Sequence, residues 1–78
     1  MKMFKEIVNY IKDSKFKIIY VNNSVDVINY DKILEVRSEV ITLEKENKLV
    51  LIKGANLKLD KLMDNEILIT GTINQIEL

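Results

Sequence analysis

The acidic side chains are the residues of this sequence that could do chemistry. Glu35, Glu39, Glu44 and Glu46 lie close together, and on a strand Glu35 and Glu39 would share a face unless a bulge intervened. Paired carboxylates can act as general acid and base. A row of this kind is more typical of a solvated, charged strand edge, and we interpret it in that way.

Missing residue types exclude most other chemistry. The 78 residues contain no His and no Cys. This excludes Ser/His/Asp catalysis and a thiolate nucleophile, and it also excludes ordinary zinc, haem and iron–sulfur sites. We therefore predict no enzymatic activity, no cofactor and no small-molecule substrate.

A second acidic group and the two glycines have structural interpretations. Asp60, Asp64 and Glu66 lie near one predicted turn, but their spacing lacks the glycine and the alternating ligands of a calcium loop. We predict no metal site there. Gly54 and Gly71 form no phosphate cradle, because the sequence has neither G-x-G-x-x-G nor a Walker A motif. Both are interpreted as structural turn or bulge residues.

The composition indicates a folded β domain. Ile, Val and Leu supply 28 of the 78 residues and there is one alanine, a balance that favours strands over helices. The 12 basic and 12 acidic residues give zero net charge, which argues against nonspecific nucleic-acid binding. Phe16, Tyr20 and Tyr30 could stack on bases, but without a basic groove we expect them to pack in the core or on the sheet.

The first residues have a helical period. One stripe of an α-helix is formed by the apolar residues Met3, Phe4, Ile7, Val8 and Ile11. We predict a short amphipathic helix over residues 1–14 and a single small β domain over residues 15–78. The helix could pack on the sheet, dock on a partner protein or lie on an anionic membrane surface. No signal peptide or membrane span is evident, so we expect a cytoplasmic protein, with a peripheral place at a membrane as the alternative.

From residue 16 onward the period falls toward two. The alternation predicts strands near residues 16–21, 25–27, 33–37, 39–44, 49–53, 57–59, 66–70 and 72–78. A turn is expected at 60–65, and Gly54 and Gly71 are expected to end strands. The tetrapeptides Leu51–Gly54 and Leu68–Gly71 repeat at an offset of 17 residues. Several strands are apolar on both faces, and small domains often oligomerise, so we predict six to eight antiparallel strands in a two-layer sheet or roll that self-associates.

The segment from Phe16 to Leu78, about 80% of the chain, resembles the YabP/YqfC family of sporulation proteins, and its YqfC branch most. The shared pattern is an apolar strand, Gly, two residues and Leu, then a spacer, an apolar strand, Gly, one residue, Ile, two residues and Ile. It is carried by Ile41–Leu43, Leu49–Leu59, Leu62 and Glu66–Ile76. The matched glycines and apolar residues bear on the fold, and the pattern supplies no catalytic residues.

The resemblance implies a role in endospore formation in Firmicutes, in the mother cell. No enzymatic activity or cofactor is established for the family, and the YqfC branch implies action beside a membrane protein of the YqfD type. Together with the two-faced strands, which predict homo-oligomers, this gives a non-enzymatic assembly protein as the expected function. A helix followed by bent strands is also the outline of Sm-like RNA-binding rings, which is the alternative prediction. Zero net charge and the lack of a basic motif count against that alternative.

Overall fold

The computed structural model describes residues 15–78, so the helix predicted over residues 1–14 lies outside the described part. The described strands are β1 (Lys17–Val21), β2 (Ser24–Ile28), β3 (Lys32–Val36), β4 (Val40–Lys45), β5 (Lys48–Leu62) and β6 (Glu66–Glu77). They form one antiparallel sheet in the order β1-β2-β6-β5-β4-β3. The prediction of a mainly β protein with antiparallel strands is confirmed. The described residues include no helix of the length and apolarity needed to cross a membrane.

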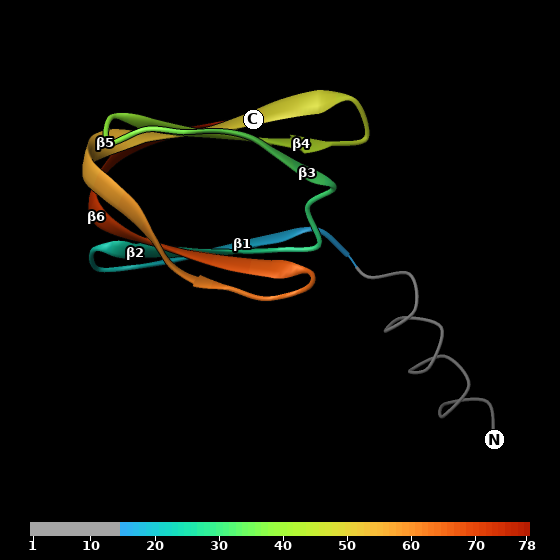
Figure 1. The fold of residues 1–78 in the computed structure, drawn as a ribbon, viewed down its shortest axis with the longest axis horizontal. Coiled ribbons are helices and arrows are strands. Elements are labelled where there is room, and N and C mark those ends of the chain that lie inside the picture. The colour runs from blue at the N-terminus through green and yellow to red at the C-terminus, as the bar shows by residue number, and fades with distance from the viewer. Residues whose placement is uncertain (1–14) are drawn as a thin grey trace, which may run out of the picture.

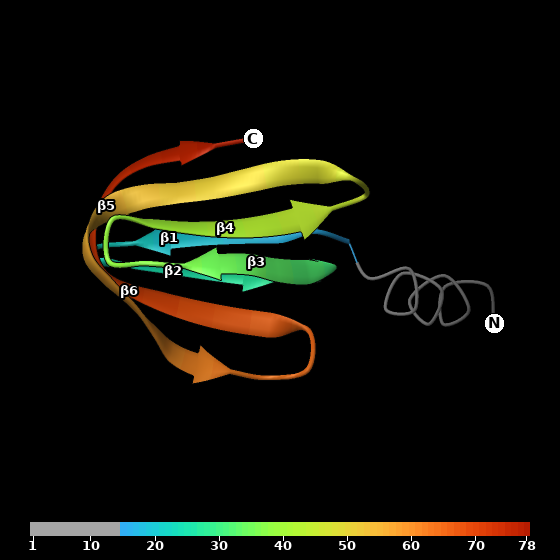
Figure 2. The ribbon, with the colours of Figure 1, turned by 45° about the horizontal axis from the view of Figure 1, so that its top comes forward.

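The sheet folds back on itself because β5 and β6 are long and bent (Figure 1). We call one side layer A; it contains β1, β2, and the segments 66–70 of β6 and 58–62 of β5. Layer B contains β3, β4, and the segments 48–53 of β5 and 72–77 of β6. The two long strands cross from one layer to the other at one end of the molecule (Figure 2).

Gly54 and Gly71 do not end their strands, contrary to the expectation from the sequence. Both strands continue through the glycine, and the pairing of β5 with β6 shifts register between Lys53 and Gly54 and again between Ala55 and Lys58. Such irregularities bend and twist a sheet without ending its ladder. The turn expected at residues 60–65 is also shorter, because β5 runs to Leu62.

Side chains are excluded at both glycines by close backbone approach. A Cβ at Gly54 would collide with the carbonyl oxygen of Thr72, and one at Gly71 would lie 2.5 Å from the carbonyl oxygen of Asn56. Gly71 also has φ +133°, which L side chains rarely adopt. The fold therefore depends on glycine at these two bends.

The two layers are built on the same plan, which accounts for the repeated tetrapeptide. In each, a hairpin pairs with the first part of one long strand, and that part pairs in turn with the second part of the other long strand. The Gly71 N–H donates to the carbonyl of Asn23 in the first hairpin turn (3.1 Å), and the Gly54 N–H donates to Glu39 beside the second (3.0 Å). Each hairpin is thus tied to the bend of the strand beside it.

The core lies between the layers. Its buried members are Val25, Val27, Ile41, Leu43, Val50, Ile52, Leu57, Ile67 and Ile69. Phe16 and Tyr30 pack against this cluster, as expected, whereas Tyr20 is 54% exposed. Because each layer directs one apolar face inward, the two layers cover each other. Most of the apolar strand faces are therefore covered within one chain.

Candidate interaction surface

β1 and β3 are the two ends of the hydrogen-bonded sheet. Within residues 15–78, β1 pairs only with β2 and β3 pairs only with β4. An edge strand keeps a row of backbone N–H and C=O groups that can pair with another chain. Both edges are therefore open to strand addition.

Exposed apolar side chains concentrate on these two edges. Five of the nine large apolar side chains exposed in the described residues belong to the five-residue strands β1 and β3. They are Ile19, Tyr20 and Val21 on β1, and Leu34 and Val36 on β3. Each is about half exposed, whereas the neighbouring Ile18 and Ile33 pack against the core. Edges that avoid association usually carry charge instead of apolar side chains.

β3 and the turn that follows it carry Glu35 and Glu39, two of the acidic residues considered above as a general acid and base. An Oε2 of Glu35 lies 3.1 Å from Nη1 of Arg37, and Oε1 of Glu39 lies 3.9 Å from Nε of the same guanidinium. The hydrogen bond and charge of Glu35, with the charge of Glu39, raise the pKa of Arg37 above its ordinary value. Arg37 thus links the two carboxylates into an exposed ion-pair cluster, which matches the interpretation of a solvated charged edge.

Asp26 and Glu66 form an acidic pair, which the register between β2 and β6 brings together. Asp26 faces Ile19 of β1 and Leu68 of β6, and Glu66 faces Ile28 beside it, so both carboxyls lie on the outer face of layer A. A hydrogen bond with Asp26, partial burial and repulsion from the Asp26 charge raise the pKa of Glu66. Oδ1 of Asp26 is buried without a hydrogen-bond partner in the described structure.

We expect Glu66→Gln to stabilise the protein at neutral pH. The pKa of Glu66 is raised in the folded state, so the folded protein holds this proton more tightly than the unfolded chain does. Wild-type stability should therefore fall as pH rises from below about 4.3 through the folded pKa. Urea midpoints of both proteins measured from pH 3 to pH 7 should converge at the acid end.

Asp31→Asn is the matched control, with the opposite sign. The Glu46 N–H donates to Oδ2 of Asp31 at 2.7 Å and, with Lys45 and Lys32, lowers the pKa of Asp31. Its contribution to stability is present above the unfolded pKa and is lost as pH falls. Asp31→Asn should thus weaken the protein at pH 7. If the Glu66→Gln protein is no more stable than wild type at pH 7, the unfavourable interaction between Asp26 and Glu66 is refuted.

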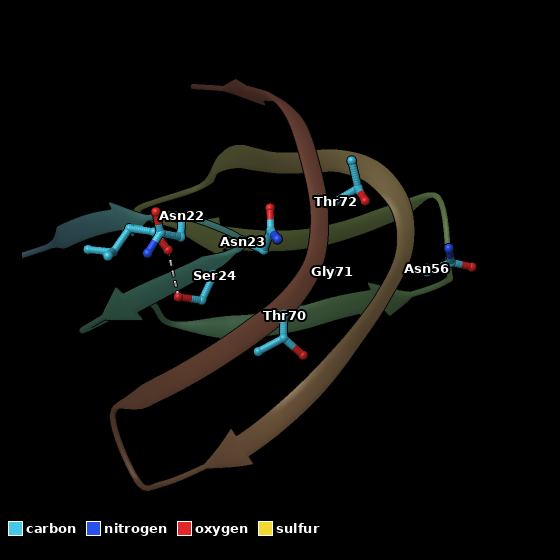
Figure 3. Close-up of a pocket in the computed structure, with 8 residues that line it drawn as sticks. Asn22, Asn23, Ser24, Asn56, Thr70, Gly71 and Thr72 are labelled. Carbon is cyan, nitrogen blue, oxygen red and sulfur yellow. Dashed lines mark hydrogen bonds between the residues drawn. The ribbon is translucent and has the colours of Figure 1, made fainter.

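A polar hollow lies where the first hairpin meets the bend of β6 (Figure 3). Its volume is about 540 Å³, and it is lined by Val21, Asn22, Asn23, Ser24, Asn56, Thr70, Gly71 and Thr72. Thr70 and Thr72 flank the bend at Gly71, while the asparagines of the hairpin turn approach from the other side. The Ser24 hydroxyl donates to the carbonyl of Val21 at 2.9 Å, which closes the hairpin.

The chemistry of this hollow is neutral. It presents amides and hydroxyls, and the Thr70 hydroxyl oxygen is buried without a hydrogen-bond partner in the described residues. None of its lining groups can act as a general base at neutral pH, so it could hold a polar group or water but could not activate a nucleophile. These amides and hydroxyls can form hydrogen bonds with a polar group or with water.

Only some of the residues singled out in the sequence fall in the described part of the structure. The apolar stripe of Met3, Phe4, Ile7, Val8 and Ile11 lies outside the described residues. Within residues 15–78, no three acidic side chains group in a way that could hold a metal ion, and this includes Asp60, Asp64 and Glu66. The pair Asp26 and Glu66 was missed, because the residues lie 40 positions apart and only the pairing of β2 with β6 joins them.

Comparison with family models, with curated proteins and with solved structures finds no match to this chain. The YabP/YqfC resemblance therefore rests on the pattern of glycines and apolar residues alone.

Proposed function

We propose that this protein is a non-enzymatic assembly module of the YabP/YqfC type, which acts in the mother cell during spore formation through self-association. The observation that supports self-association best is the concentration of exposed apolar residues on β1 and β3, the two strands at the ends of the sheet. Strand addition needs an open row of backbone groups and apolar side chains that gain from burial, and both are present together at β1 and β3.

The lack of reactive groups supports a non-enzymatic role. The chain has no His or Cys, and the carboxylates Glu35 and Glu39 are held by Arg37. The hollow beside Gly71 offers neutral hydrogen-bonding groups only. A module that acts by docking needs edges and faces, which are the features that this chain offers.

We further propose that residues 1–14 dock on a membrane protein of the YqfD type or on the membrane surface. Support comes from the amphipathic pattern of the segment and from its charge. Residues 1–17 carry a net +3 and the remaining residues a net −3. A pull-down from sporulating cells should retain a membrane protein that is lost when residues 1–14 are deleted. Retention by the deleted protein would refute this role.

We expect Ile19→Lys/Val21→Lys to reduce self-association at least tenfold. Both side chains are about half exposed on β1, so lysine there should leave the core intact while it places charge on the edge. Light scattering across a concentration series measures the change. Leu49→Lys is the matched control, because Leu49 is equally exposed but lies on β5, where it pairs with Glu44 of β4 and belongs to neither β1 nor β3. Equal effects of the two variants would contradict an interface at β1.

The Sm-like alternative makes a different prediction. Such a ring would bind RNA with a strong dependence on salt. The acidic pair Asp26 and Glu66 on the outer face of layer A favours protein docking over RNA on that face. RNA binding at physiological ionic strength would support the ring in place of the assembly module, and no binding at low salt would exclude it.

A further inference from the structure

We infer that copies of this chain assemble head to tail, with β1 of one copy paired with β3 of the next. The inference rests on the proposed function, because it specifies how the copies of a self-associating module meet. The alternative is pairing of like edges, β1 with β1 or β3 with β3, which would give a closed dimer with two-fold symmetry.

The two edges match in length and exposure, although the pairing of β3 with β4 shifts register between Ile33 and Glu35 and that of β1 with β2 does not. Each has five residues and the same pattern of exposure, in which the second residue packs on the core and the others lie open. Those second residues are Ile18 and Ile33. The equivalence follows from the shared plan of the two layers, in which β1 and β3 hold the same place. A β3 strand is therefore long enough to cover β1 along its whole length.

Charge disfavours the pairing of two β1 edges. Lys17 is the one charged residue of β1, and it makes no ion pair within residues 15–78. Two β1 strands side by side would combine lysines without any carboxylate. β3 carries Glu35, and its own Lys32 already lies 3.9 Å from Glu44 of β4 in the same copy. Pairing β1 with β3 would bring Glu35, which already lies 3.1 Å from Arg37 of its own copy, beside the strand that lacks a carboxylate, and opposite charges across strands are stabilising.

An interface between unlike edges leaves a pair of copies with one free edge of each kind, β3 on one copy and β1 on the other. Such assembly either closes into a ring or grows as a filament. It also has a property that like-edge pairing lacks. A copy blocked at β1 can still accept a partner at β3, so two proteins blocked at different edges should complement each other.

A mixing experiment tests this property. Ile19→Lys/Val21→Lys blocks the β1 edge, and Leu34→Lys/Val36→Lys blocks the β3 edge. All four side chains are about half exposed, so the core should remain intact, and circular dichroism checks that the strands persist. Leu49→Lys again serves as the control. The full-length proteins are measured by light scattering, alone and as an equimolar mixture.

We expect the wild type to form species larger than a dimer and each blocked protein to be monomeric. The equimolar mixture should then form a dimer and nothing larger. A dimer formed by either blocked protein alone would show pairing of like edges and overturn the inference, as would a mixture that stays monomeric while the wild type assembles. A monomeric wild type would overturn the proposed self-association itself, and the head-to-tail inference with it.

Charge reversal gives a second measurement that does not disturb the apolar residues. Lys17→Glu and Glu35→Lys should each weaken association by up to about fivefold, which is the upper range for a cross-strand charge pair. The protein that carries both changes should recover association, because the carboxylate and the ammonium exchange strands. Failure of the double variant to recover would contradict the pairing of β1 with β3.

Discussion

Gly54→Ala is expected to lower the free energy of unfolding by about 3 kcal/mol, at the upper end for overpacking a well-packed site. The added Cβ would overlap the carbonyl oxygen of Thr72, which belongs to the neighbouring strand β6. Neither partner can swing aside, because both atoms are tied to the backbone at the point where β5 and β6 bend together. Relief would require separating the strands that join the two layers.

Urea unfolding at fixed protein concentration measures this effect. Ala55→Ser is the matched control, because Ala55 is the next residue along β5 and its side chain is exposed. The control should change stability by less than about 0.5 kcal/mol. A Gly54→Ala protein as stable as the Ala55→Ser protein would contradict the close approach of the strands.

Ile52→Ala should cost about 3 kcal/mol, within the range for truncating a buried aliphatic side chain. Ile52 is fully buried, and it lies on β5 between Ile41 of β4 and Ile76 of β6. A domain of this size has a small margin of stability, so the variant should be partly unfolded at 37 °C.

Leu49→Ala in the same strand is the comparison for Ile52→Ala. Leu49 is 51% exposed, so its truncation should cost less than about 1 kcal/mol. Thermal unfolding followed by circular dichroism separates the two variants. Similar losses at the two positions would mean that the core does not lie between the layers as described.

Local patterns predicted most of the strands, because side chains in a half-buried strand alternate between core and solvent. β1 through β4 begin and end within about two residues of the predicted ranges. Residue type also fits the two-residue turns at Asn22–Asn23 and Glu46–Asn47, since Asn tolerates the positive φ found at Asn22 and Asn47. Glu46 has a positive φ as well, which its residue type did not indicate.

These local patterns could not predict which strands pair across long stretches of the chain. Gly54 and Gly71 read as breaks, yet β5 and β6 run through them because each strand continues to pair with the other across the bend. The order of strands was equally hidden, since β2 pairs with β6 across about forty residues of chain. Ile19 at an open edge and Ile41 in the core are alike in sequence and differ only in their neighbours. The candidate surface is therefore a product of strand order.

The central claim is that the edges of the sheet are where copies of this protein meet. Hydrogen exchange of the backbone amides at low and high protein concentration tests it most directly, because strand addition protects N–H groups that otherwise face water. We predict that protection at β1 (Lys17–Val21) and β3 (Lys32–Val36) rises with concentration, while protection at the interior strand β4 (Val40–Lys45) stays constant. Unchanged exchange at both edges across the concentration range would contradict the account.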